Sequence, residues 1–234
     1  MIQLAQNSLE ELIKKLLGTP SGYTESSMAA LRDKDDIRGK VYDTAPYLSS
    51  IIGLANSEEV KFQLENLSNH SSNSFSCVNI NVRLDFGHAR LQKVHNLGVH
   101  QDFHYVNTFV TPKNSFVLWA PIKILSPKVG GIGFVKDLAN IDGAINHEAH
   151  HRGKNQAPHW IAHTDQTELD IEHLRLHTGE FLLFDMRHLH TSVPNKDPIF
   201  PRITLQARFS SFHEPGFKEY YKDLPKVKTS EELK

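Results

Sequence analysis

Four side chains from three separate parts of the sequence are of the types that could build one metal site. His100 and Asp102 are separated by a single residue, and His190 follows much later in the chain. Two histidines and one carboxylate form the ligand set that holds Fe(II) on one face and leaves the opposite positions open for oxygen chemistry. Arg202 carries a planar guanidinium suited to gripping a carboxylate with two hydrogen bonds. The set predicts a non-haem iron site beside an anchor for an acidic molecule.

The spacing of the first two ligands suits an extended strand. Side chains at i and i+2 of a strand point to the same side, so His100 and Asp102 would face one point and Gln101 would face away. His104 would share the ligand side if the strand continued, either near the pocket or as a structural histidine. One strand cannot supply the third ligand, which must come from a neighbouring strand.

His190 is well placed to be the third ligand, because it follows the apolar run at residues 181–184, which is typical of a buried strand. His188 lies two residues earlier on the same strand face and is the rival for this position.

The last strand candidate, residues 202–212, has two distinct faces. The polar face of such a strand is ordinarily exposed to solvent, and this explains the presence of an arginine at position 208. In a barrel with an aqueous pocket, however, the polar face lines the interior, and Arg202 would then reach a ligand. The apolar face carries Ile203, Leu205, Ala207 and Phe209, and the polar face carries Arg202, Thr204, Gln206 and Arg208.

The elements that must position these residues change type along the chain. Apolar residues at helical spacing predict a helix over 9–17, with a capping box at Ser8 and Glu11 and a stop at Gly18. Further helices are expected over 47–54 and over 58–67, the latter capped by Ser57. From residue 75 the apolar period becomes two, which predicts strands. The strand candidates are 77–84, 115–124, 131–135, 171–176, 180–184 and 202–212.

Helices followed by many short strands predict a mostly β fold, a jelly roll with flanking N-terminal helices. We expect one domain over 1–234, with a helical flank at 1–70 and the jelly-roll core at 75–212.

A polar segment at residues 137–165 fits neither period and is interpreted as a lid-like insertion. Within it, His147-Glu148-Ala149-His150-His151 matches the zinc-protease pattern H-E-x-x-H. That chemistry needs both histidines on one face of a helix, and no apolar stripe supports a helix here. A zinc hydrolase using His147, Glu148 and His151 is therefore an unfavoured alternative.

Composition limits the remaining classes of function. The 26 Lys and Arg residues nearly balance the 27 Asp and Glu residues, which argues against a nucleic-acid binder. Cys77 is the single cysteine, so no disulfide forms within the chain and a cytoplasmic setting is expected. No apolar run is long enough to span a membrane.

Several ordered segments resemble the phytanoyl-CoA dioxygenase family of iron- and 2-oxoglutarate-dependent oxygenases. The first metal strand of that family is similar to residues 97–105, and its next core strand is similar to 115–121, which includes Trp119. Gly130-Gly131 resembles its glycine-pair turn, and residues 179–195 resemble the segment of its distal histidine. Arg202 falls where the family keeps its co-substrate arginine.

The resemblance implies a double-stranded β-helix and a hydroxylation that consumes O2 and 2-oxoglutarate and releases succinate and CO2. It implies that His100, Asp102 and His190 bind Fe(II), and that Arg202 with Ser192 holds the distal carboxylate of 2-oxoglutarate. The retained Asp102 argues for hydroxylation, because related halogenases carry a small residue there.

Three further residues are pocket candidates, each with a structural alternative: Trp119, Arg83 and His104. The expected partner is a small-molecule substrate. A jelly-roll binding module without catalysis is the alternative from another class.

Overall fold

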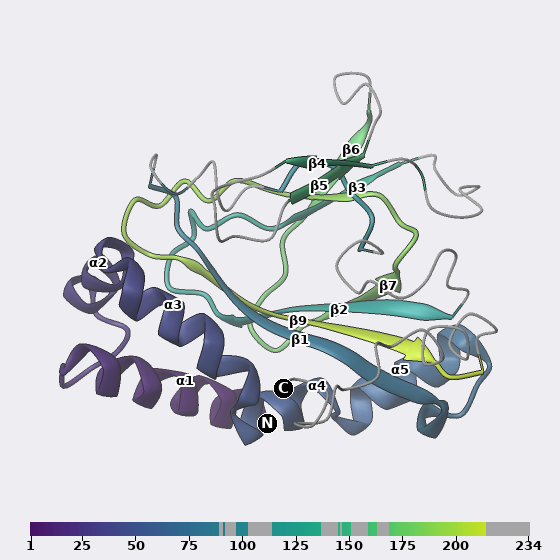
Figure 1. The fold of residues 1–234 in the computed structure, drawn as a ribbon, viewed down its shortest axis with the longest axis horizontal. Helices are drawn as coiled ribbons and strands as arrows, with labels where there is room; N and C mark the ends of the chain where they lie inside the picture. Colours follow the sequence, from purple (N-terminus) through teal and green to yellow (C-terminus); the bar gives the residue numbers. More distant parts are fainter. Residues whose placement is uncertain are drawn as a thin grey trace, which may run out of the picture.

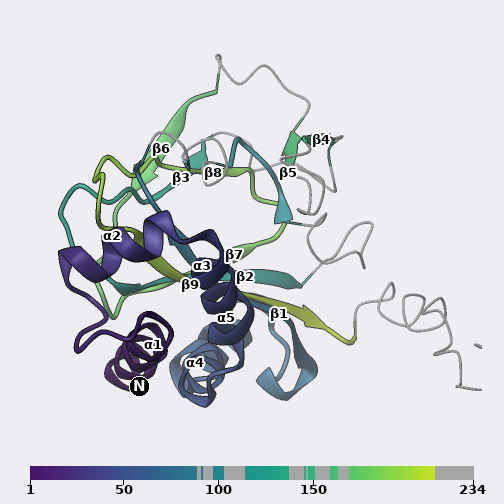
Figure 2. The same cartoon turned by 60° about the vertical axis from the view of Figure 1, so that its left-hand side comes forward.

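The computed structural model describes residues 1–88, 91, 97–102, 114–136, 145, 147–150, 159–162 and 169–213. Three layers are visible in Figures 1 and 2: the helices cover one face of a β-sheet, and a second set of strands lies over the opposite face. No helix among the described residues has both the length and the apolar character needed to cross a membrane.

The first layer is helical, as the sequence predicts, but its first helix starts earlier than expected. Helix α1 begins at Ile2, so the predicted capping box at Ser8 is wrong; Ser8 lies inside the helix. The apolar stripe extends back to the buried Ala5, one helical turn before Leu9, and packing of this stripe outweighs the local cap signal. Gly18 ends the helix with a φ of 69°, as predicted.

The cap of the last helix is confirmed, because the hydroxyl of Ser57 accepts a hydrogen bond from the backbone N–H of Val60 at 3.4 Å. The helices are α1 (Ile2–Leu17), α2 (Glu25–Asp33), α3 (Asp35–Thr44), α4 (Ser49–Ala55) and α5 (Glu58–Ser68), with short 3-10 turns at Ala45–Tyr47 and Ser72–Ser74.

The strands form antiparallel sheets. The larger sheet has the order β1-β9-β2-β7 and contacts the helices; a second sheet has the order β6-β3-β8, and β4 pairs with β5. The strands are β1 (Phe75–Asp85), β2 (Ser115–Lys123), β3 (Ile132–Val135), β4 (His147–His150), β5 (His159–Ala162), β6 (Ile171–Leu174), β7 (Leu182–Asp185), β8 (His190–Ser192) and β9 (Arg202–Ser211). Six of these match predicted strands.

The main apolar core lies between the helices and the larger sheet. Leu9 and Ile13 of α1 belong to the same core cluster as the apolar residues of β9, so the polar face of β9 must point away from the helices. That polar face is not solvent-exposed: Arg202, Thr204 and Arg208 are all buried. The polar face of β9 therefore lines the interior between the sheets, where apolar residues such as Val117 and Phe184 also lie.

The predicted insertion at 137–165 contains two strands that the sequence did not reveal, β4 and β5. The H-E-x-x-H motif begins in β4, which is extended and not helical, so its first four residues lack the geometry of a zinc protease. His151 lies outside the described residues, as does most of the insertion.

Candidate metal centre

The structure brings His100, Asp102 and His190 together between the two sheets. The potential ligand atoms of these residues all lie within 4.8 Å of one another, and all three side chains are buried. Asp102 Oδ1 lies 3.5 Å from His100 Nε2 and 3.7 Å from His190 Nε2. Among the described residues this is the one group of three or more such side chains with the spacing of a metal site.

Backbone pairing fixes the positions of the two histidines. His100 and His190 form an antiparallel bridge in which each N–H donates to the carbonyl of the other, at 2.9 and 3.0 Å. The segment at 97–100 thus lies beside β8, and the N–H of Ala162 in β5 donates to the Val99 carbonyl on its other side at 2.8 Å. The predicted neighbouring strand for the third ligand is therefore β8.

Hydrogen bonds also fix the tautomer of each imidazole. His100 Nδ1 lies 2.7 Å from the Gly98 carbonyl oxygen, and His190 Nδ1 lies 3.0 Å from the His188 carbonyl oxygen. A carbonyl oxygen only accepts, so both Nδ1 atoms must carry the proton. In the neutral rings each Nε2 then keeps its lone pair and faces Asp102, which is the arrangement that a metal-binding histidine needs.

The two oxygens of Asp102 have different surroundings. Oδ2 accepts a hydrogen bond from Arg208 Nε at 2.9 Å, and the Arg208 guanidinium also donates to Asn79 Oδ1 at 2.8 Å. Oδ1 is buried without a hydrogen-bond partner among the described residues. A buried carboxylate oxygen without a donor is costly, so its position between two imidazole Nε2 atoms fits a divalent cation.

The charges of the site favour metal binding. Burial alone would raise the pKa of Asp102, but the Arg208 guanidinium and the two imidazoles hold it well below its ordinary value, so the carboxylate stays ionised. Burial, with a smaller contribution from His100, lowers the pKa of His190 to about 3, so its imidazole is neutral at neutral pH. Metal ligands need these two protonation states.

Arg208 and Asn79 are site residues that the sequence analysis missed. We expected Arg208 to be a solvent-exposed arginine, but it is buried against Asp102. The available signal was its even separation from Arg202, which places both on one face of β9.

Arg202 lies at the start of β9, opposite Asp85 in the register of β1. Its Nη2 lies 2.5 Å from Asp85 Oδ2 and 3.5 Å from Ser192 Oγ, and its Nη1 donates to the carbonyls of Gly131 and Val193. Its Nε is buried without a hydrogen-bond partner among the described residues. Arg202 is thus held rigidly, next to the predicted Ser192, with one donor unused.

Ion pairs link the charged side chains of the interior. Asp85 Oδ1 accepts from Arg83 at 2.9 Å while Oδ2 meets Arg202, and Asp102 is paired with Arg208. Among the described residues, two carboxylates thus lie next to three guanidiniums. Arg83 is held in an ion pair with Asp85.

A small cavity of about 20 Å³ adjoins the metal ligands and reaches Ser192 and Gly131, both of which contact Arg202. Trp119 forms part of its wall, and the Arg202 guanidinium lies 5.9 Å from the Trp119 ring centroid. Trp119 is therefore a cavity residue as well as a buried one. This cavity connects the metal ligands with the surroundings of the predicted carboxylate anchor.

The remaining candidates are placed as follows. His188 is exposed and packs edge-on against Phe134 at 5.0 Å between ring centroids, so it is His190 and not His188 that joins the metal ligands. His104 lies outside the described residues.

Gln101 points away from the metal ligands, as predicted, and contacts the insertion. Its backbone N–H donates to His147 Nε2 at 2.9 Å, and its side-chain oxygen accepts from the N–H of Ile145 at 2.9 Å. Its side-chain amide donates to the Arg187 carbonyl at 2.6 Å. The first histidine of the H-E-x-x-H motif thus supports the ligand-bearing segment through hydrogen bonds.

Comparison with known proteins shows what this arrangement resembles. Neither a family model nor a curated protein matches the sequence. Among solved structures, the chain is similar to the non-haem monooxygenase ThoJ, with a TM-score of 0.54 and 12% identity over 88% of this chain and 72% of that one. The chain has the fold of a non-haem oxygenase.

Two further structures support the same fold. The epimerase SnoN, solved with Fe3+, alpha-ketoglutarate and nogalamycin RO, gives a TM-score of 0.53 and 16% identity over 80% of this chain and 70% of that one. EvdO2 from Micromonospora carbonacea var. aurantiaca gives a TM-score of 0.51 and 14% identity over 80% of this chain and 83% of that one. At these identities the likeness concerns the fold, and the assignment of chemistry depends on the residues described above.

Proposed function

We propose that this chain is an Fe(II)- and 2-oxoglutarate-dependent dioxygenase that hydroxylates a small-molecule metabolite and releases succinate and CO2. The observation that carries the proposal is the buried Asp102 Oδ1, which has no hydrogen-bond partner among the described residues and lies within 3.7 Å of the Nε2 atoms of His100 and His190. One Fe(II) ion bound by these three atoms would satisfy the carboxylate oxygen and both ring lone pairs.

In this proposal Arg202 and Ser192 hold the distal carboxylate of 2-oxoglutarate. Two observations support it: the Arg202 Nε that has no hydrogen-bond partner among the described residues, and the cavity that leads from the metal ligands to Ser192. The ion pair with Asp85 keeps the guanidinium in place.

When bound, Fe(II), 2-oxoglutarate and O2 supply the oxidising chemistry, and the chain supplies geometry and exclusion of water. The carbonyls of Gly98 and His188 keep both imidazoles in the metal-binding tautomer. Arg208 keeps Asp102 ionised and turned toward the histidines. Burial of all three ligands limits access of bulk water.

The antiparallel sheets that enclose the ligands support a double-stranded β-helix, and the ordered motifs support membership of the phytanoyl-CoA dioxygenase family. The bound nogalamycin RO of the SnoN structure supports a small-molecule substrate here. Residues 133–137 depart from the usual loop of that family, which leaves the substrate class broad.

The test combines binding and turnover. Without oxygen, addition of Fe(II) and 2-oxoglutarate should produce a weak visible charge-transfer band, and with oxygen and a substrate library the protein should release succinate. Asp102→Ala and His190→Ala should lose both signals, whereas His188→Ala, two residues away, should keep them. Arg202→Ala should need more 2-oxoglutarate for the same band. A folded wild-type protein without the band would be a non-catalytic binder, and the proposal would be wrong.

A further inference from the structure

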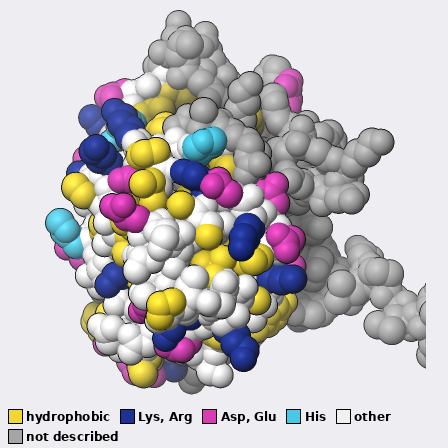
Figure 3. Space-filling view, turned by 90° about the vertical axis from the view of Figure 1, so that its left-hand side faces the viewer, with side chains coloured by type: hydrophobic (Ala, Val, Ile, Leu, Met, Phe, Trp, Pro, Cys, Tyr) yellow, Lys and Arg dark blue, Asp and Glu magenta, His cyan; other side chains and the backbone are white. Residues whose placement is uncertain are grey.

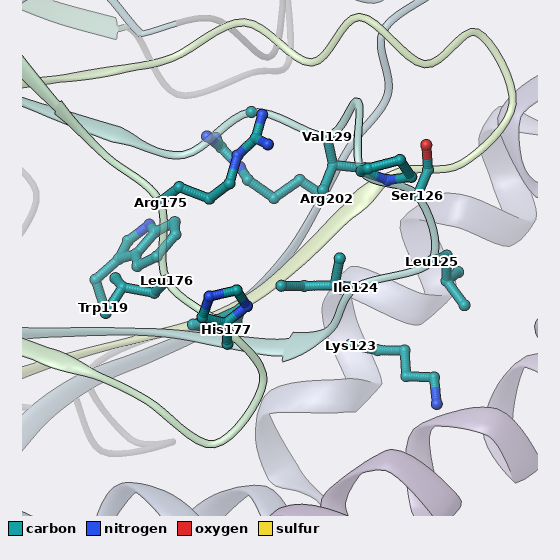
Figure 4. Close-up of a pocket in the computed structure, with 13 residues that line it drawn as sticks. Trp119, Lys123, Ile124, Leu125, Ser126, Val129, Arg175, Leu176, His177 and Arg202 are labelled. Carbon is teal, nitrogen blue, oxygen red and sulfur yellow. The ribbon is translucent and has the colours of Figure 1, made fainter.

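A second, larger pocket of about 350 Å³ is lined by Arg202 and Trp119 (Figure 4). The loop after β2 and the segment after β6 build most of it, and the two buried residues Arg202 and Trp119 close its inner end. Arg175 and His177 are exposed and mark its outer end. Its volume is in the range of ordinary small-molecule sites, and it contains none of the metal ligands.

Two arginines give this pocket a positive charge. Arg175 and Arg202 line it together with His177 and Ser126, and no carboxylate does among the described residues. Arg175 makes no hydrogen bond or ion pair with any described residue, although Arg202 is paired with Asp85. In Figure 4 the side chains of Arg175 and Arg202 extend from opposite sides toward the same part of the pocket. The Lys123 side chain is directed away from the two arginines, and its ammonium lies 5.9 Å from the Tyr23 ring centroid (Figure 4).

The other walls are apolar. Trp119, Ile124, Leu125, Val129 and Leu176 line the space around the arginines. On the face that Figure 3 presents, basic and acidic side chains are both present among hydrophobic ones. The positive charge of the pocket is thus a local feature that selects for an acid with an apolar body.

We propose that this pocket is a second ligand site, which binds a small organic carboxylate. The acid group lies against the Arg175 guanidinium, where Arg202 adds positive charge from the inner end, and the apolar part packs against Ile124, Leu125 and Leu176. This site does not depend on iron or 2-oxoglutarate. Arg202 lines this pocket, whereas the lining of the metal cavity includes His100, Asp102 and His190.

The experiment uses the full chain without added metal and a matched pair of probes, 4-phenylbutyrate and its neutral amide, measured by isothermal titration calorimetry. The acid should bind at least tenfold more tightly than the amide. Arg175→Met should weaken binding of the acid about tenfold, which corresponds to about 1.4 kcal/mol. The control Lys128→Met should leave it unchanged, because Lys128 is an exposed lysine on the same loop that does not line the pocket. Leu176→Trp should fill the pocket and abolish binding.

Three results would overturn the proposal: no detectable binding of the acid at millimolar concentration, equal binding of acid and amide, or an unchanged affinity in Arg175→Met. His190→Ala separates this site from the proposed active site. If the acid binds to this variant with the wild-type affinity, the second ligand site is supported even where the dioxygenase proposal fails. If binding is lost in His190→Ala and kept in Arg175→Met, the acid occupies the metal cavity and the second site does not exist.

Discussion

At the scale of single residues, the pairing of Arg208 with Asp102 orients the only carboxylate of the proposed metal site. Arg208 Nε donates a hydrogen bond to Asp102 Oδ2, so Oδ1 is the oxygen that faces the two imidazoles. Outer hydrogen-bond partners of metal ligands commonly govern affinity nearly as strongly as the ligands themselves. Arg208 is therefore a positioning residue.

Arg208→Met should lower the affinity for Fe(II) by about tenfold to a hundredfold, because Asp102 loses the donor that orients it and keeps it ionised. Arg208→Lys retains the charge but not the planar guanidinium, so its affinity for Fe(II) should lie between those of wild type and Arg208→Met. Anaerobic titration of Fe(II), with circular dichroism to confirm folding, measures this. A folded Met variant whose affinity matches wild type would contradict the role.

A second prediction concerns pH and the metal-free protein. The folded-state pKa of His190 is about 3, below its usual 6.5, so the unfolded chain takes up a proton first as the pH falls. The free energy of unfolding should therefore decrease from about pH 6.5 downward. The depressed pKa of Asp102 adds a further loss only below about pH 4.

Urea unfolding at pH 7.5 and pH 5 checks this prediction, with His190→Gln as the reference. Wild type should lose more stability between the two pH values than the variant does, since other histidines affect both proteins alike. Equal losses would show that His190 does not titrate as its burial implies.

At the scale of elements, the glycine pair before β3 permits a close approach of two chain segments. A Cβ on Gly130 would collide with the Val193 carbonyl oxygen, and that oxygen also accepts a hydrogen bond from Arg202 at 3.3 Å. Gly131 is similarly confined by the Leu174 carbonyl. The turn thus sets the distance between β3 and the chain that follows β8.

Gly130→Ala should destabilise the protein by about 1–3 kcal/mol, because a backbone atom cannot move aside at low cost. Gly39→Ala in α3 is the matched control: nothing lies within 4 Å of its added Cβ, and alanine is the better helix former, by up to about 1 kcal/mol. Urea unfolding should show opposite signs for the two variants. Stabilisation by both would mean that the turn is looser than described.

At the scale of the whole molecule, the apolar core and the proposed metal site lie on opposite faces of the larger sheet. The helices pack on one face, and the ligands lie against the other, where the polar side of β9 points (Figure 1). Stability and metal binding should therefore respond to different substitutions.

Leu9→Ala should cost about 2–5 kcal/mol of stability, because Leu9 is fully buried in the helix–sheet core and leaves a cavity. Leu4→Ala, on the same helix but 62% exposed, should change stability by less than about 0.5 kcal/mol. Fe(II) affinity of both variants, measured below their unfolding transitions, should equal that of wild type. A weakened affinity in Leu9→Ala alone would show that the helical layer also holds the site together.

The sequence by itself determined the local features whose cause is local. Period-two patterning located β1 and β9, Gly18 ended α1, and the spacing of His100 and Asp102 identified them as a pair of candidate metal ligands. The burial of Arg208, the ion pair of Asp85 with Arg202 and the strands β4 and β5 were decided by the tertiary structure alone. Alternation shows that two side chains share one face of a strand. Whether that face meets water or another layer depends on how separate sheets pack, and this contact between distant segments leaves no periodic trace in the chain.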